Sequence, residues 1–280
     1  MEKIAIVTDS TCDIPDGDLL KYNIKMIPLR ILYSFGELRD RIETTAEEVY
    51  EGLQKEIPKT SLPMPLDVTT LFEELVKEGY THALVTTLSS GLSGTYNMIK
   101  NVVTKFKELE VEVIDSKSLS FGLGFPVLEA AKEVLSSNSF SKAVDKAKEV
   151  IVKTDTFYAI DTLEYLRKGG RIGLVEGTIG QLLGIKPIIS INEEGKYFTF
   201  SKVRGRNQSI NELFKIVKER TNGEPFNVAV MHGHAKEEAL KLLERIKGLV
   251  GLNEVYFDQI SPVLGVHTGP GLLGVIVYKL

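Results

Sequence analysis

ALVTTLSSGLSGTYNMIKNVVTKFKELEVEVI, residues 83–114, is the stretch of sequence that decides the fold. It starts with a short apolar strand at 83–86 and ends with a second strand at 111–114. Between them, a turn rich in Ser and Gly opens a helix that we expect to continue to about residue 107. Strand, turn, helix and strand in this order are typical of a parallel sheet that is covered by helices.

The rest of the first half repeats this alternation. A capping-box pattern that begins at Thr44 predicts the start of one helix, and a helix with apolar residues on one face is expected to stop at Gly79. Residues 59–65 are expected to be irregular, because Pro63 and Pro65 interrupt them. The remaining predictions are strands at 4–7 and 25–32 and helices at about 44–56, 119–135 and 140–152. The first half is therefore predicted to be a parallel α/β/α domain.

The second half has a different pattern. Two strands flank the turn at 192–195 and predict a β-hairpin, whereas the segments around it alternate between strand and helix. A hairpin among crossover connections indicates a mixed sheet, so we expect a second, α+β domain. Strands are expected at 156–160, 186–191, 196–203, 227–231, 254–259 and 274–278, and helices near 163–167, 209–220 and 236–249. The predicted domains are residues 1–154 and 155–280, with a ligand between them, since no long linker separates the two.

The composition excludes several classes of function. The net charge of -4 and the pI near 5.7 argue against nucleic-acid binding, which requires a concentrated cationic surface. Cys12 is the only cysteine, so the chain can form no intrachain disulfide and has no CxxC metal site. The first apolar run is too short for a secretory leader, and no run of 18 apolar residues predicts a membrane span. We therefore expect a cytoplasmic protein.

The Ser/Gly turn at 89–95 is the first candidate site. Four of its seven residues carry a hydroxyl, whereas capping a helix requires only one. This excess favours an anion, held by hydroxyls and by the backbone N–H groups at the start of the helix. A hydrolase in which Ser93 and His267 cooperate is a less favoured alternative, because Thr95 stands where the Gly-x-Ser-x-Gly elbow requires Gly.

A second candidate lies near the end of the chain, where residues 269–274 match GxGxxG. We reject a dinucleotide site, because that motif needs a helix after it and residues 274–278 predict a strand. The preferred interpretation is a tight turn that brings His267 and Thr268 to the edge of the cleft.

Other polar residues carry weaker signals. His232 and His234 have no third ligand at a suitable spacing, so no metal is expected. Asp9 follows the first strand and is expected to form a turn, whereas its neighbour Ser10 is a candidate to line a pocket. Arg171 follows two glycines and could reach a carboxylate or a phosphate, although composition alone favours an exposed side chain with no such role.

Taken together, these segments resemble the DegV family from Ile4 to Leu280. The motifs that carry the resemblance are Thr8-Asp9-Ser10-Thr11, Lys59-Thr60-Ser61, the segment 90–95, the segment 163–172 and His267-Thr268-Gly269-Pro270-Gly271. The resemblance implies a two-domain α/β fold and a lipid-binding carrier without a cofactor or catalysis of its own. Similar proteins are the carrier subunit of bacterial fatty acid kinase, which implies that a separate ATP-dependent kinase subunit converts the bound acid to acyl phosphate.

The resemblance also implies a binding site for the fatty acid carboxylate. Its expected residues are Thr60, Ser61, Ser93, Gly94, His267 and Thr268. Arg171 is expected at the mouth, facing the kinase. The family often has Thr-Ser-Gln-Pro-Ser at the first of these segments, whereas this chain has Leu62 and Met64 on either side of the proline, which makes the loop more apolar.

We therefore expect the chain to bind one long-chain fatty acid, such as palmitate or stearate, with its tail in an apolar tunnel. Burial of roughly 14 methylenes at about 0.8 kcal/mol each contributes about 11 kcal/mol before entropic costs, so the tail dominates affinity. The main alternative is a small-anion module for a phosphate or a sugar acid. A deep apolar tunnel behind Ser93 favours the lipid, and a shallow polar cleft favours the small anion.

Overall fold

The computed structural model describes residues 2–178 and 184–280, and the first of its two large sheets is parallel. Four strands lie in the order β2-β1-β6-β7, and every neighbouring pair is parallel. They are β1 (Ile4–Asp9), β2 (Ile24–Ile27), β6 (His82–Thr87) and β7 (Glu110–Asp115). Nearly all residues of β1 and β6 are buried, as expected when helices cover both faces of a sheet. The parallel sheet predicted for the first half is confirmed.

The second large sheet is mixed, as predicted. Six strands lie in the order β10-β9-β8-β13-β11-β12, and only the pair β11–β12 is parallel. They are β8 (Thr154–Ala159), β9 (Ile185–Ile191), β10 (Tyr197–Arg204), β11 (Phe226–Gly233), β12 (Leu252–Gln259) and β13 (Leu272–Lys279). Strands β9 and β10 form the predicted hairpin. The division of the chain at 154/155 into two domains stays a prediction.

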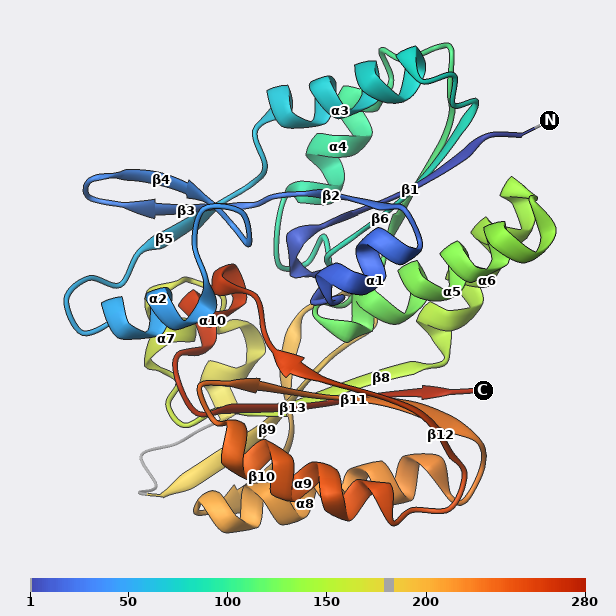
Figure 1. The fold of residues 1–280 in the computed structure, drawn as a ribbon. Coiled ribbons are helices and arrows are strands. Elements are labelled where there is room, and N and C mark those ends of the chain that lie inside the picture. The colour runs from blue at the N-terminus through green and yellow to red at the C-terminus, as the bar shows by residue number, and fades with distance from the viewer. Residues whose placement is uncertain (1, 179–183) are drawn as a thin grey trace.

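Helices and sheets alternate in layers (Figure 1). Val7 and Val85 pack toward α3 and α4 on one face of the parallel sheet, whereas Ile6 and Leu84 face α5 on the other. Helix α5 contacts strands of both large sheets, and α8 and α9 cover the outer face of the mixed sheet. Helix α6 packs against α5. The bounds of the helices in these layers are α3 (Pro65–Lys77), α4 (Thr95–Val103), α5 (Phe121–Ser137), α6 (Phe140–Val152), α8 (Arg206–Thr221) and α9 (Lys236–Lys247).

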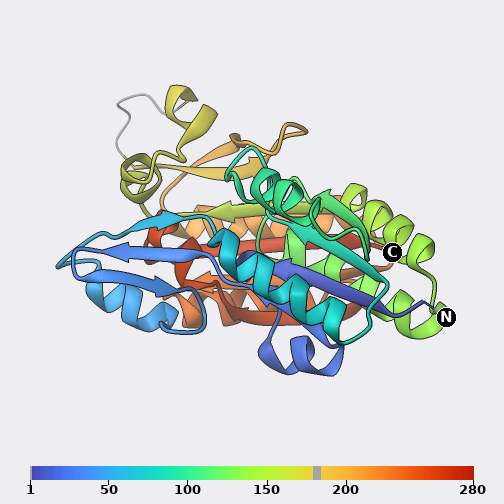
Figure 2. The ribbon, with the colours of Figure 1, turned by 90° about the horizontal axis from the view of Figure 1, so that it is seen from above.

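A third, small antiparallel sheet was not predicted. Its strands are β3 (Arg30–Tyr33), β4 (Gly36–Arg39) and β5 (Lys59–Ser61), in the order β4-β3-β5. The single strand expected at 25–32 is wrong, because Pro28 has no N–H to continue the ladder and the chain passes there from β2 to β3. The irregular segment expected at 59–65 is wrong for 59–61, which pair with β3. Figure 2 shows this sheet at the end of the molecule away from the two termini.

The helix ends also differ from the predictions. The capping box begins at Thr45 with Glu48, one residue later than predicted, and α4 ends at Val103 instead of near 107. The tight turn predicted after His267 and Thr268 is present, since Gly269 and Gly271 have positive φ, and His267 and Thr268 are the last two residues of α10 before it. The remaining elements are η1 (Ser10–Cys12), α1 (Asp16–Lys21), α2 (Ala46–Gly52), α7 (Glu164–Lys168), η2 (Gly173–Thr178) and α10 (Pro262–Thr268).

None of the helices within residues 2–178 and 184–280 combines the length and apolar character that crossing a membrane requires.

Candidate functional site

A cavity of about 280 Å³ lies where the carboxyl ends of β1 and β6 approach β5 and α10. Residues from both halves of the chain line it, so it occupies the position between the two sheets that was expected for a ligand. Half of its fourteen lining residues are Leu or Val. The lining residues are Thr11, Leu29, Thr60, Ser61, Leu62, Leu88, Leu92, Ser93, Leu119, Arg171, Tyr197, Val263, Leu264 and His267.

Five of the residues expected at the site line the cavity, and we call the part around the contact of Thr60 with His267 its polar end. Thr60 and Ser61 come from β5, Ser93 precedes α4, His267 is in the last turn of α10, and Arg171 follows α7. The closest contact joins Thr60 Oγ1 to His267 Nε2 at 2.7 Å, across 207 residues of sequence.

His267 is neutral at pH 7. Burial, together with the positive charge of Arg171, lowers the pKa of His267 to about 4. Its Nδ1 is buried and has no hydrogen-bond partner among the described residues. We assign the proton to Nε2, because a buried donor without a partner costs more than a buried acceptor without one. His267 then donates to Thr60, which leaves the Thr60 hydroxyl proton free to bind a ligand.

Arg171 brings a positive charge to this polar end. Its Nη1 donates to the carbonyl oxygen of Gly169 at 2.6 Å, which turns the side chain back toward α10. Gly169 has to lack a side chain, since a Cβ there would lie 2.2 Å from Nδ1 of His267. None of the ion pairs within residues 2–178 and 184–280 includes Arg171. Arg171 lines the cavity, where its guanidinium could pair with an anion.

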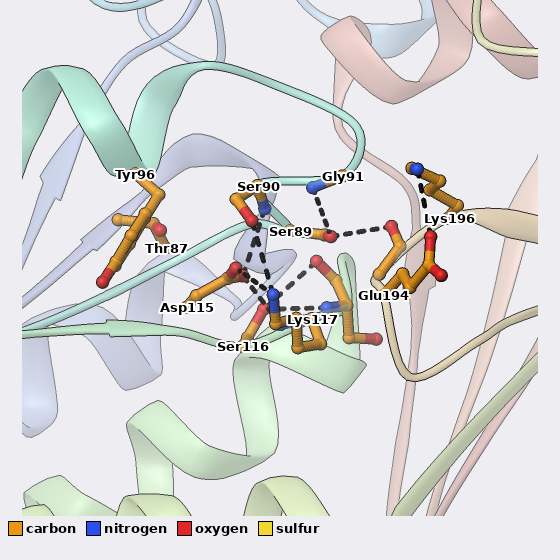
Figure 3. Close-up of polar contacts among 12 residues, drawn as sticks. Thr87, Ser89, Ser90, Gly91, Tyr96, Asp115, Ser116, Lys117, Glu194 and Lys196 are labelled. Atoms are coloured by element: carbon orange, nitrogen blue, oxygen red, sulfur yellow. Dashed lines mark hydrogen bonds and ion pairs between the residues drawn. The ribbon is translucent and has the colours of Figure 1, made fainter.

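The Ser/Gly turn is only partly a ligand site, and most of its hydroxyls have structural partners. Ser93 lines the cavity and accepts the N–H of Thr95 at 3.3 Å, while Ser89 is fully buried and donates to the carbonyl of Gly195 at 2.7 Å. Figure 3 shows the tip of the β9–β10 hairpin against this turn. The close approach requires glycine, because a Cβ on Gly91 would lie 2.6 Å from the carbonyl of Glu194. Of the four hydroxyl residues at 89–95, Ser93 lines the cavity and Ser89 binds the hairpin of the second half of the chain.

A second, narrow apolar space adjoins the cavity, and we call it the apolar branch. Leu119, Tyr197 and Leu264 line both spaces, and the branch is bounded by β8, β11 and β13 of the mixed sheet. Its open volume is about 20 Å³. It is lined by Leu119, Ser120, Thr156, Phe157, Tyr158, Tyr197, Met231, Ile260, Leu264, Thr268, Leu272, Gly274 and Ile276.

Two of the expected site residues lie elsewhere. Thr268 lines the apolar branch, and its hydroxyl donates to the carbonyl of Leu264 at 3.0 Å instead of facing the polar end. Gly94 is an exposed residue at the N-cap of α4 and does not line the cavity. Leu88 and Leu92 also line the cavity and were not expected there, although Leu88 precedes the Ser/Gly turn and Leu92 lies within it.

The segment after β1 has the turn that was predicted for Asp9. Its Oδ1 accepts the N–H and the hydroxyl of Thr11, and its Oδ2 accepts the N–H of Leu88. Ser10 is not a pocket residue, because it is fully buried and accepts the N–H of Leu29 at 3.0 Å. Thr11 lines the cavity in its place.

Catalytic and metal chemistry have little support in this geometry. His232 packs against Phe257 with ring centroids 5.5 Å apart, and His234 packs against Tyr50 at 5.7 Å. Within the described part of the chain, no group of three or more His, Cys, Asp or Glu residues could hold a metal ion. A serine hydrolase needs a histidine that contacts the serine and is oriented by a third group. Here Nε2 of His267 contacts Thr60, and no described carboxylate contacts Nδ1.

Comparison with known proteins places this geometry in a family. A model described as "Uncharacterised protein, DegV family" matches residues 3–280. A DegV domain-containing protein of Clostridium acetobutylicum is 45% identical over 279 residues, covering 100% of both chains. The crystal structure of DegV, a fatty acid binding protein from Bacillus subtilis, covers 100% of both chains with a TM-score of 0.92 and 30% identity. A stearic acid-binding protein from Eubacterium ventriosum covers 100% of this chain and 98% of its own, with a TM-score of 0.87 and 27% identity. The chain belongs to the DegV family.

Proposed function

We propose that this protein binds one long-chain fatty acid, with the carboxylate at the polar end of the cavity and the tail in the apolar branch. The observation that carries the proposal is that the cavity and the apolar branch lie side by side and share Leu119, Tyr197 and Leu264 as lining residues. An amphiphile with one charged end fits such a lining, because each of its ends then lies against groups of its own polarity. The fatty acid-binding structures from Bacillus subtilis and Eubacterium ventriosum support the same class of ligand.

The carboxylate would be held by one charge and several hydroxyls. Arg171 supplies the charge, and the hydroxyls of Thr60, Ser61 and Ser93 supply donors, while His267 orients Thr60 through its Nε2. Burial of an ionised carboxylate is costly unless donors replace its water. Charge-assisted hydrogen bonds offset that cost, and the tail then supplies the net affinity.

The tail would enter the apolar branch by rearranging the side chains that now fill it. The branch is open to only about 20 Å³, whereas ligand sites in proteins are typically about 300–1,000 Å³. The polar cavity alone is close to the lower limit of that range. A small phosphate or sugar acid would leave the apolar branch without a role, so the geometry does not favour that alternative.

We further propose that the protein presents the carboxylate to a separate kinase subunit for conversion to acyl phosphate. Support comes from a second recess of about 370 Å³ outside the cavity, which shares Thr60, Arg171 and His267 with it. Lys59 and Lys168 also line this recess, so the carboxylate end would lie beside a basic opening. Such an opening suits the phosphates of a nucleotide held by a partner.

The first experiment is native mass spectrometry of the purified protein, with solvent extraction and identification of any bound molecule. We expect one fatty acid per chain, with occupancy reduced in Ser93→Ala and His267→Ala. Lys105→Ala, in the turn after α4 and outside the lining of the cavity, is the control and should keep full occupancy. A protein that purifies empty and takes up neither palmitate nor stearate would rule out the proposal.

The kinase step has its own test. We would mix the loaded protein with a bacterial fatty acid kinase subunit and ATP, and measure acyl phosphate. Arg171→Ala should slow its formation more than it weakens fatty acid binding, because Arg171 faces both the cavity and the basic recess. Binding of fatty acid without any acyl phosphate from the wild-type protein would contradict the kinase step alone.

A further inference from the structure

Helix α10, which carries His267, has an unusual start. Its N-cap residue Ser261 makes no side-chain hydrogen bond to the helix, and Pro262 has no N–H to donate. A helix of seven residues is too short to be stable by its own hydrogen bonds. Its position therefore depends on groups outside it.

Two buried carboxylates from the first half of the chain bind the first N–H groups of α10. Asp13 Oδ1 accepts the N–H of Ser261 at 2.8 Å, and Asp40 Oδ1 accepts the N–H of Val263 at 2.9 Å. Both aspartates are almost completely buried, at 4% and 0% exposure. The side-chain oxygens of the two aspartates provide the capping that Ser261 does not.

Asp40 is also tied to the small sheet that carries Thr60. It directly follows β4, and its own N–H donates to the carbonyl of Leu29, which lines the cavity. The same sheet ends in β5, where Thr60 contacts His267. The sheet therefore holds α10 at two points, Val263 and His267, which are four residues or about 6 Å apart along the helix.

We propose that Asp40 is a positioning residue for the ligand site: it fixes α10 against the small sheet so that His267 meets Thr60, which binds the fatty acid carboxylate. Asp13 has the same role at Ser261, two residues before Val263. Neither carboxylate lines the cavity, so neither touches the ligand directly. This inference rests on the proposed fatty acid binding, and it assigns a positioning role to residues outside the lining.

The test is a double-mutant cycle on palmitate affinity, with wild type, Asp40→Ala, His267→Ala and the double variant. If Asp40 acts through His267, Asp40→Ala weakens binding about tenfold in the wild-type background, comparable to the loss of a helix cap. In the His267→Ala background the same change should weaken binding less than twofold. A purely structural role would give the same loss in both backgrounds, and that result would overturn the inference.

Controls separate the possible failures. Ser139→Ala removes the side-chain cap of α6, far from the site, and should lower stability without changing palmitate affinity. If Asp40→Ala does not fold, Asp40→Ser takes its place in the double-mutant cycle. The serine hydroxyl fills part of the space of the carboxylate but is too short to reach the N–H of Val263. An unchanged affinity in the folded Asp40 variant overturns this inference alone, whereas a wild-type protein that binds no palmitate overturns the proposed function as well.

Discussion

Gly274 offers a way to test where the tail of the fatty acid lies. It is in β13 between Leu272 and Ile276, and all three line the apolar branch, as alternate residues of one strand face do. Across the ladder Gly274 pairs with Met231, and a Cβ on Gly274 would lie 3.6 Å from the Met231 Cβ. That distance is ordinary van der Waals contact, so a small side chain fits the strand while it occupies space in the branch.

Gly274→Val adds three carbon atoms at this point. If they displace about three methylenes of the tail, at about 0.8 kcal/mol each, palmitate binding weakens by about 2.4 kcal/mol, or about 60-fold. Gly274→Ala is the matched control and displaces about one methylene, which corresponds to about fourfold. Decanoate, whose tail is shorter by six carbons, should bind both variants within about twofold of wild type because it does not reach Gly274.

The assay is displacement of a fluorescent fatty acid by palmitate and by decanoate, with thermal unfolding as the check that each variant is folded. The expected result is a chain-length cutoff that shortens from Gly to Ala to Val. Equal losses for palmitate and decanoate would mean that the substitution damages the site as a whole. An unchanged palmitate affinity in a folded Gly274→Val variant would place the tail elsewhere and refute the assignment of the branch.

Three further predictions follow from the contacts around the cavity. Because the pKa of His267 is lowered to about 4 while an unfolded histidine titrates near 6.5, the unfolded state takes up the proton first as the pH falls. Wild type should therefore lose up to about 3 kcal/mol relative to His267→Gln between pH 7 and pH 4, measured by urea unfolding, and a flat difference would contradict a neutral His267. Arg171→Ala should reduce the preference for palmitate over its methyl ester about tenfold or more, whereas Arg167→Ala, which removes an exposed ion pair, should leave the competition ratio unchanged. Gly91→Ala should lower the unfolding free energy by about 1–3 kcal/mol because its Cβ meets the hairpin backbone, while Gly17→Ala, with open space around it, serves as the control in the same denaturation assay, and equal stabilities would contradict the tight contact.

The sequence by itself determined the two large sheets and their character. Apolar runs at β1 and β6 with helices after them require a sheet buried on both faces, and the turn at 192–195 requires an antiparallel hairpin. Both signals are local, because they depend on spacing and turn chemistry within one segment. The turn-forming role of Asp9 was predictable for the same reason, since a short carboxylate beside free N–H groups binds them.

Only the tertiary structure decided which polar side chains meet in the cavity. Thr60 and His267 are 207 residues apart, and their contact depends on a small sheet and a short helix that local patterns did not reveal. Ser10 and Thr11 both carry a hydroxyl directly after β1, so the sequence alone does not tell which of them faces the cavity. The direction of the chain after β1 turns Thr11 toward the cavity and Ser10 toward the N–H of Leu29. Ser and Thr have several possible roles: they cap helices, connect one sheet to another, or bind ligands, and the residue type is the same in each case. What separates these roles is the set of partners that packing brings within hydrogen-bonding distance, and those partners come from distant parts of the chain.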